Sequence, residues 1–223
     1  ARQGLTDAKL RDLLPRERAY KVSDGGNGLY VVVSPGGSRS FRYDYRQEWL
    51  RFTNLLSAGD RAVSPDQRSI EALANLVESP GGLLWMRDDE GNALVPAGRW
   101  NVADTGQRID TSASLPVFLK RTGWIVKLPE YRKHPERYAE LSLPPWLESS
   151  PWAWLIVPIN AQDELIGVVV LAAPRTPIDV NWEVLDLLKT AARQVGSFLG
   201  QIRATRALLE ARQFEAFSKM TAF

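Results

Sequence analysis

His134 is the only histidine of the chain and the first residue to consider for chemistry. An imidazole can act as a general base or accept a phosphoryl group near neutral pH. The residue stands directly before Pro135, in a segment without the helical context of a phosphoacceptor histidine. We therefore expect His134 to be a solvated loop residue, and we predict no catalytic residue in this chain.

Other patterns that could carry chemistry have simpler explanations. Asp88 and Asp89 precede a glycine and an asparagine, and acids are favoured in such a turn for conformational reasons alone. The glycines from Gly25 to Gly28 lead into a strand, whereas a phosphate-binding loop needs a following helix and a lysine. The chain has no cysteine and no cluster of metal-ligand residues. We predict no metal, no cofactor and no enzymatic activity.

Ligand binding is a more open question. Aromatic side chains with nearby arginines can form a pocket for a planar or anionic ligand. Six candidates lie in or beside the middle of the chain: Arg99, Trp100, Trp124, Trp146, Trp152 and Arg175. The alternative, that these tryptophans fill a core and these arginines lie on the surface, stays open.

The composition limits the class of protein. A chain of 223 residues with 44% hydrophobic and 24% charged residues can form one large domain or two small ones with a packed core. The absence of cysteine fits a reducing compartment. No apolar run approaches the ~20 residues that span a bilayer, and no signal region begins the chain. We therefore expect a soluble, cytoplasmic location.

Charge is distributed unevenly along the chain. The first 51 residues carry ten Lys or Arg and six acids, a balance of +4, so the remainder carries −2. A basic module of this kind could contact nucleic acid, and the candidate residues are Lys9, Arg11, Lys21, Arg39 and Arg42. A solvated basic surface without a nucleic-acid partner is the alternative.

The basic segment has its own pattern of elements. Thr6 is a suitable N-cap for a short helix that ends before Pro15. Asp24 begins a glycine-rich turn, Leu29–Val33 predicts a strand, and the strand from Ser40 pairs with it as a hairpin.

This order of residues resembles the amino-terminal arm domain of tyrosine-type phage integrases over residues 5–46, chiefly through Ser23–Gly26 and Gly28–Tyr30. The third strand that this family usually has does not follow Arg46, and the family's recombinase core with its catalytic tyrosine is absent. The resemblance therefore implies at most a DNA-binding arm. A weaker alternative is that residues 1–39 only assist folding in place of a membrane anchor.

The rest of the chain alternates helices and strands. We predict helices over 47–56, 69–77 and 115–120, strands over 83–86, 93–97, 124–126, 152–159 and 164–171, an irregular stretch over 128–151, and a long helix over 182–223. This is an α+β layout, and the hairpin from Val157 to Leu171 resembles that of GAF-like sensory domains. The implied fold is an antiparallel sheet flanked by helices. The predicted domains are 1–39 and 40–223.

Longer stretches indicate a narrower resemblance. Over residues 40–223, and especially in Phe41–Thr53, Trp182–Thr190 and Ala211–Phe217, the chain resembles membrane-bound sensor histidine kinases of the PEP-CTERM/exosortase system (PrsK type). The resemblance implies a non-catalytic sensory module whose phosphoacceptor histidine motif would begin just beyond Phe223. Together with the integrase-like segment it implies a composite chain, whether natural, misread or engineered.

The terminal helix carries an apolar stripe with spacings of three and four residues. Leu185, Leu188, Val195, Leu199 and Ile202 belong to it. Such a repeat is typical of paired helices, so we expect a homodimer formed through this helix. The alternative is that the stripe packs on the sheet of its own chain, which Leu185 to Leu199 could do.

Overall fold

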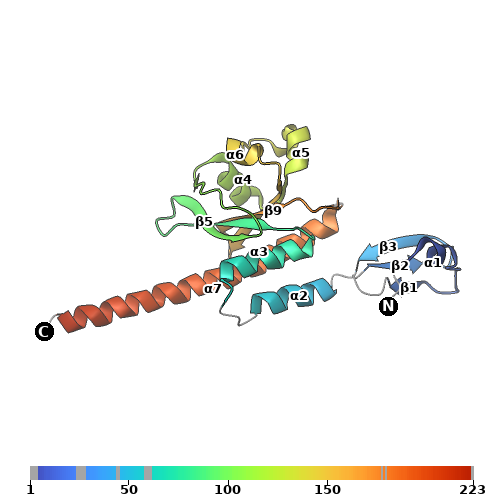
Figure 1. Ribbon diagram of the computed structural model, residues 1–223, viewed down its shortest axis with the longest axis horizontal. Coiled ribbons are helices and arrows are strands. Elements are labelled where there is room, and N and C mark those ends of the chain that lie inside the picture. Colours follow the sequence, from blue (N-terminus) through green and yellow to red (C-terminus); the bar gives the residue numbers. More distant parts are fainter. Residues whose placement is uncertain are drawn as a thin grey trace. The chain divides into compact units, whose positions relative to one another are not determined.

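The computed structural model describes residues 5–23, 29–43, 46–57, 62–176, 178 and 180–221, with side chains for all of these except 29, 41–43, 46–48 and 214–221. The chain divides into two compact units, residues 1–54 and 55–223 (Figure 1). The boundary expected between residues 39 and 40 falls inside strand β3 (Arg39–Tyr43).

The amino-terminal unit is a helix followed by a small sheet. Thr6 caps helix α1 (Asp7–Arg11) as expected, since its hydroxyl accepts a hydrogen bond from the Lys9 amide at 3.4 Å. Strands β1 (Tyr20–Ser23), β2 (Leu29–Val33) and β3 pair antiparallel in that order. The expected hairpin therefore gains a third strand, β1, which is too short for sequence alternation to indicate. The turn predicted at Asp24 lies outside the described residues.

Helix α2 (Arg46–Ser57) follows β3 and confirms the helix predicted over 47–56. Its Trp49 and Phe52 rings stack with centroids 5.1 Å apart. The side chains of Phe52 and Leu56 are buried.

The larger unit is built on a six-stranded antiparallel sheet in the order β6-β5-β4-β9-β8-β7. The strands are β4 (Gly82–Arg87), β5 (Ala93–Trp100), β6 (Ile109–Asp110), β7 (Val126–Lys127), β8 (Ala153–Ala161) and β9 (Glu164–Ala172). All five predicted strands of this unit are present, and β6 is an addition. The central strands β4, β8 and β9 are apolar on both faces because helices cover both sides of the sheet.

Helices cover both faces of this sheet (Figure 1). Helices α3 (Pro65–Leu76) and α7 (Trp182–Thr221) share the first face. The opposite face carries α4 (Ser114–Thr122), α5 (Leu128–Lys133), the 3₁₀ helix η1 (Pro135–Tyr138) and α6 (Pro145–Glu148).

The stretch predicted to be irregular, 128–151, therefore contains three short helices. Pro129, Pro135 and Pro145 each lie in the first turn of one of them, where a proline loses no hydrogen bond. Segments of four to six residues are too short to show a helical period, which explains why the sequence pattern missed them.

Side-chain caps begin the two longer helices on the first face. The Ser64 hydroxyl accepts from the Gln67 amide at 3.1 Å and begins α3. Asn181 accepts from the Val184 amide at 3.0 Å and begins α7. Helix α7 is 40 residues long and so extends about 60 Å, which confirms the long helix predicted from Trp182.

The core between the sheet and the short helices is a cluster of buried apolar residues. Trp85 of β4 belongs to it with 1% of its surface exposed, as do Leu119, Leu128, Leu147 and Ile156. Its indole Nε1 donates to the carbonyl oxygen of Gln107 at 2.8 Å, so the one polar atom of this side chain is satisfied.

Candidate functional site

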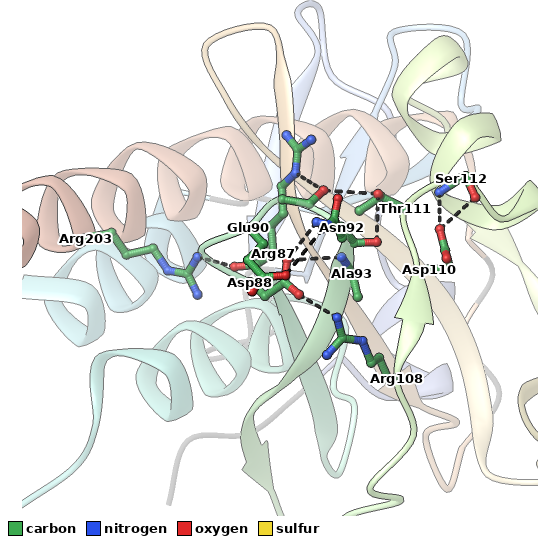
Figure 2. Close-up of polar contacts among 11 residues, drawn as sticks. Arg87, Asp88, Glu90, Asn92, Ala93, Arg108, Asp110, Thr111, Ser112 and Arg203 are labelled. Carbon is green, nitrogen blue, oxygen red and sulfur yellow. Dashed lines mark hydrogen bonds and ion pairs between the residues drawn. The ribbon is translucent and has the colours of Figure 1, made fainter.

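The turn between β4 and β5 is held by a network of polar contacts around Asp88 (Figure 2). One carboxylate oxygen of Asp88 accepts from the amides of Asn92 at 2.8 Å and Ala93 at 3.1 Å. The other accepts from Arg108 at 2.8 Å. These bonds stabilise the ionised form, so the pKa of Asp88 is lowered, chiefly by the Ala93 amide. Asp88 thus serves the turn, as predicted.

Arg87, the last residue of β4, connects this turn to two other parts of the fold. Its Nε donates to the carbonyl of Gly91 at 3.1 Å, and its Nη1 lies 3.4 Å from Glu164 of β9. Its own carbonyl oxygen accepts a hydrogen bond at 2.7 Å from Nη1 of Arg203 on α7 (Figure 2). One residue therefore joins the turn, the sheet and the long helix.

A groove with a volume of about 620 Å³ opens beside this turn, between α4 and the ends of β4, β5 and β9. Its cations are Arg87, Lys120 and Arg121, and its hydroxyls belong to Thr111 and Ser112. Aliphatic side chains of the two layers form the remaining surface. We call this site the basic groove.

The hydroxyls at the basic groove are oriented by hydrogen bonds to the β4–β5 turn and to Asp110 at the end of β6. Thr111 donates to the carbonyls of Gly91 at 3.1 Å and Asn92 at 2.9 Å. Ser112 donates from both its amide and its hydroxyl to Asp110, and these bonds lower the pKa of the Asp110 carboxyl (Figure 2). The wall of the groove is thus a fixed arrangement rather than a loose loop.

A second, smaller groove of about 350 Å³ lies between the 124–138 segment and the first turns of α7. Trp124 and Tyr138 line it from one side, and Leu185 and Lys189 line it from α7. Glu130 lies at its edge.

The Glu130 carboxylate is surrounded by donors. It accepts from Lys127 and Arg137, each at 2.7 Å, and from the Tyr138 hydroxyl at 3.3 Å. These contacts, the one with Lys127 first, lower the pKa of Glu130 to about 2. Burial in turn raises the pKa of Tyr138.

The six residues predicted to bind a ligand are distributed over several places. Arg99 and Trp100 are consecutive in β5 and so point to opposite faces of the sheet. The Trp124 ring packs edge-on against Phe118 at 6.0 Å and lines the smaller groove.

The remaining three candidates, Trp146, Trp152 and Arg175, also lie in different places. Trp146 lies 5.5 Å from the ring of Trp85, and both Trp146 and Trp152 pack against the core. Arg175 is exposed after β9. The structure therefore packs Trp146 and Trp152 against the core, and it places Trp124 beside two core residues, Phe118 and Tyr138. Binding by the set of six stays a prediction.

The stripe on α7 is divided between the sheet and solvent. Leu188, Val195 and Leu199 are buried within the chain itself, whereas Leu185 and Ile202 are half-buried. Beyond them Leu208 and Leu209 each expose 54% of their surface. The first half of the helix thus packs on the sheet of its own chain, which was the alternative to a dimer. Dimerisation through the second half stays a prediction.

Arg39 and Lys21, which are predicted to contact DNA, make contacts within their own unit. Arg39 donates to the carbonyls of Arg11 and Leu13, which holds the end of α1 near β3. Lys21 lies over the Tyr30 ring at 4.4 Å. Lys9 and Arg11 are exposed on α1, and the side chain of Arg42 lies outside the described residues.

His134 connects α5 to η1, and its Nδ1 lies 3.1 Å from Glu136 in a half-exposed contact. Within the described ranges, no three acidic or histidine side chains converge as a metal site would require. No helix in the described part of the chain combines the length and apolarity needed to cross a bilayer.

The fold defines a structural class: an α+β domain with one antiparallel sheet between two helical layers. The chain belongs to the GAF domain family, whose model matches residues 67–199, more than half of its length. GAF domains are signal-sensing modules of signalling proteins and are generally not catalytic. No curated protein sequence matches the chain.

Solved structures share this fold. The GAF domain of a phosphoenolpyruvate-protein phosphotransferase from Coxiella burnetii has a TM-score of 0.56 at 17% identity, over 72% of this chain and 95% of that one. The GAF domain of an Acinetobacter phosphoenolpyruvate-protein phosphotransferase has a TM-score of 0.52 at 18% identity, over 71% and 93%. Residues 122 to 287 of a methyl-accepting chemotaxis protein have a TM-score of 0.52 at 16% identity, over 70% and 98%.

Sequence reasoning missed the basic groove. Its cations come from β4 and α4, and its hydroxyls follow β6, so no local motif joins them. One signal was present in the sequence. Lys120 and Arg121 follow Val117 by three and four residues, which places all three on one face of a helix.

Proposed function

We propose that this chain is the sensory and dimerisation module of a sensor histidine kinase, in which the GAF unit biases the pairing of helix α7. The kinase context is supported by the sequence resemblance over residues 40–223. The observation that carries the proposal is the length of α7, because the sheet covers only its first half.

The first half of α7 is attached to the sheet at several points. Leu188, Val195 and Leu199 are buried, and Gly196 lies so close to β8 that an added Cβ would come within 1.9 Å of the Asn160 carbonyl oxygen. Arg203 then bonds to β4. A displacement of β4 or β8 therefore has direct contacts through which to move the helix.

The second half of α7 has no such cover among the described side chains. Leu208 and Leu209 are exposed, and an isolated helix with exposed leucines gains stability when a second helix buries them. A homodimer through this segment would give the module two arrangements to choose between, as a relay requires.

Solution mass by light scattering tests this proposal on the full chain and on a chain that ends after Gly200. We expect a dimer for the full chain and a monomer for the shorter one. A point variant, Leu209→Glu, should also be monomeric, whereas Ala211→Glu on the opposite side of the helix should remain a dimer. A monomeric full chain at high concentration contradicts the proposal.

A further inference from the structure

We propose that the basic groove is the input site of this module and that it takes a small amphipathic monoanion, a carboxylate with an apolar body. The inference rests on the proposed sensory function and adds to it the place and chemistry of the ligand. Three observations carry it: the charge of the groove, its apolar surface, and its connection to α7.

The charge balance of the basic groove favours a single negative charge. Among the described residues, no acidic side chain lines it. Arg87 pairs with Glu164, and Arg121 pairs with Glu140, so each of these cations has one carboxylate beside it. Lys120 is exposed on the same face of α4 and makes no ion pair within the described part of the chain. One positive charge is therefore left for a ligand, which matches one carboxylate.

The remaining surface of the basic groove is aliphatic. Leu94 and Leu165 are buried residues of β5 and β9, and Pro116 is buried in α4. Val117 exposes 49% of its surface beside the cations. Such an exposed apolar side chain next to three cations suits a molecule with an apolar body and a charged end, and a volume of about 620 Å³ suits a small ligand.

The connection to α7 makes this groove an input site rather than only a binding site. The Arg87 guanidinium lines the groove, and the carbonyl of the same residue accepts from Arg203. A carboxylate in the groove would compete with Glu164 and the Gly91 carbonyl for this guanidinium. The end of β4 would then adjust, and Arg203 would transmit the adjustment to the helix.

Calorimetric titration of the full chain tests the binding step. The probes are 4-phenylbutyrate, its uncharged analogue 4-phenylbutan-1-ol, and inorganic phosphate. We expect 4-phenylbutyrate to bind and the other two to bind at least tenfold more weakly. Lys120→Gln should weaken 4-phenylbutyrate roughly tenfold, the loss of about one charge-assisted contact. Lys133→Gln, an exposed lysine on α5, should have no effect.

Equal binding of the alcohol or of phosphate overturns the proposal, as does a Lys120→Gln variant that binds like the original chain, or no binding at all. Amide exchange tests the input step: 4-phenylbutyrate should change the protection of residues 201–213, and should fail to do so in Arg203→Met. Binding without that change overturns the input assignment. The dimer measurement is independent of these probes, so a failure of the groove is distinguishable from a failure of the proposed function.

Discussion

The guanidinium of Arg203 donates from Nη1 to the carbonyl oxygen of Arg87 at 2.7 Å, joining residues that lie 116 positions apart in the chain. Arg203 lies four residues beyond Leu199, the last buried residue among the described side chains of α7. The bond thus lies beyond the part of the helix that is buried against the sheet. It ties the free-standing half of α7 to the turn that borders the basic groove.

Removal of this bond should loosen α7 locally. In Arg203→Met, we expect faster amide exchange for residues beyond Gly200 and for the β4–β5 turn, because the helix loses its hydrogen bond to β4. The exposed contact contributes little to global stability, so the midpoint of urea unfolding should change little. Arg212→Met, at an exposed position further along the helix, is the matched control. Identical exchange in both variants would show that the bond does not hold the helix.

The close approach of α7 to β8 should make Gly196 intolerant of a side chain. An alanine Cβ there would lie 1.9 Å from the carbonyl oxygen and 2.6 Å from the carbonyl carbon of Asn160, and neither backbone atom can move independently. We expect Gly196→Ala to lower the free energy of unfolding by about 2 kcal/mol or more, as overpacking does.

Gly200→Ala is the control for this prediction. Its Cβ would lie 3.3 Å from the Ala161 Cβ, and alanine favours the helix by about 1 kcal/mol over glycine. Urea unfolding should therefore show a clear loss of free energy of unfolding for Gly196→Ala, and a smaller loss or a gain for Gly200→Ala. Equal stability for Gly196→Ala and the original chain would contradict the described contact.

The strands of the sheet could be predicted from short sequence patterns, whereas the partner of the terminal helix could not. The strands Leu83–Met86 and Glu164–Leu171 are confirmed because runs of apolar residues bounded by turn residues indicate buried strands. The terminal stripe was also visible, but its period alone does not tell a partner helix from the chain's own sheet. The burial of Leu188 and the exposure of Leu209 make that distinction, and both depend on where the sheet ends.

The basic groove could not be predicted in the same way. Arg87, Thr111 and Lys120 meet because β4, the loop after β6 and α4 converge, a consequence of sheet order rather than of spacing. The tryptophans were also only partly predicted. Trp85 was not among the candidate residues, yet it belongs to the core cluster against which Trp146 and Trp152 pack, and its ring lies beside that of Trp146.

Asp66 should make the fold less stable as pH rises. It lies on α3 over Gly98, and burial there raises its pKa above 3.8, although the charges of Arg203 and Arg206 partly lower it. A carboxyl with a raised pKa in the folded state stabilises the fold below its unfolded pKa, and this contribution is lost as pH rises through the folded value. We expect Asp66→Asn to be more stable than the original chain at pH 7, by up to about 1 kcal/mol.

The advantage of Asp66→Asn should shrink as pH falls through the raised folded pKa of Asp66 toward the unfolded value of 3.8, and it should be absent at lower pH, where the original carboxyl is protonated in both states. Asp186→Asn, on the exposed side of α7, should show no such pH-dependent difference. Thermal unfolding of the three proteins from pH 3 to pH 7 gives the comparison. A lower stability of Asp66→Asn at pH 7 would mean that the arginine charges outweigh the cost of burial.

Glu130 should have the opposite dependence on pH. Its pKa is lowered to about 2 by Lys127, Arg137 and Tyr138, so the ionised form stabilises the folded chain. A depressed pKa contributes stability above the unfolded value, near 4.5, and this contribution is lost as pH falls toward about 2. We expect Glu130→Gln to unfold more readily at pH 7 by about 1 kcal/mol, less than the full shift implies because solvent screens these pairs.

The defect of Glu130→Gln should diminish steadily between pH 4.5 and pH 2, and Glu148→Gln at an exposed position of α6 should show none. Because Glu130 also borders the groove formed by Trp124 and Leu185, the variant has a second readout. Release of Lys127 and Arg137 should alter the surroundings of Trp124, which its fluorescence emission can report. A Glu130→Gln chain with full stability at pH 7 would show that the three donors find equivalent partners in water, and the cluster would then have no structural role.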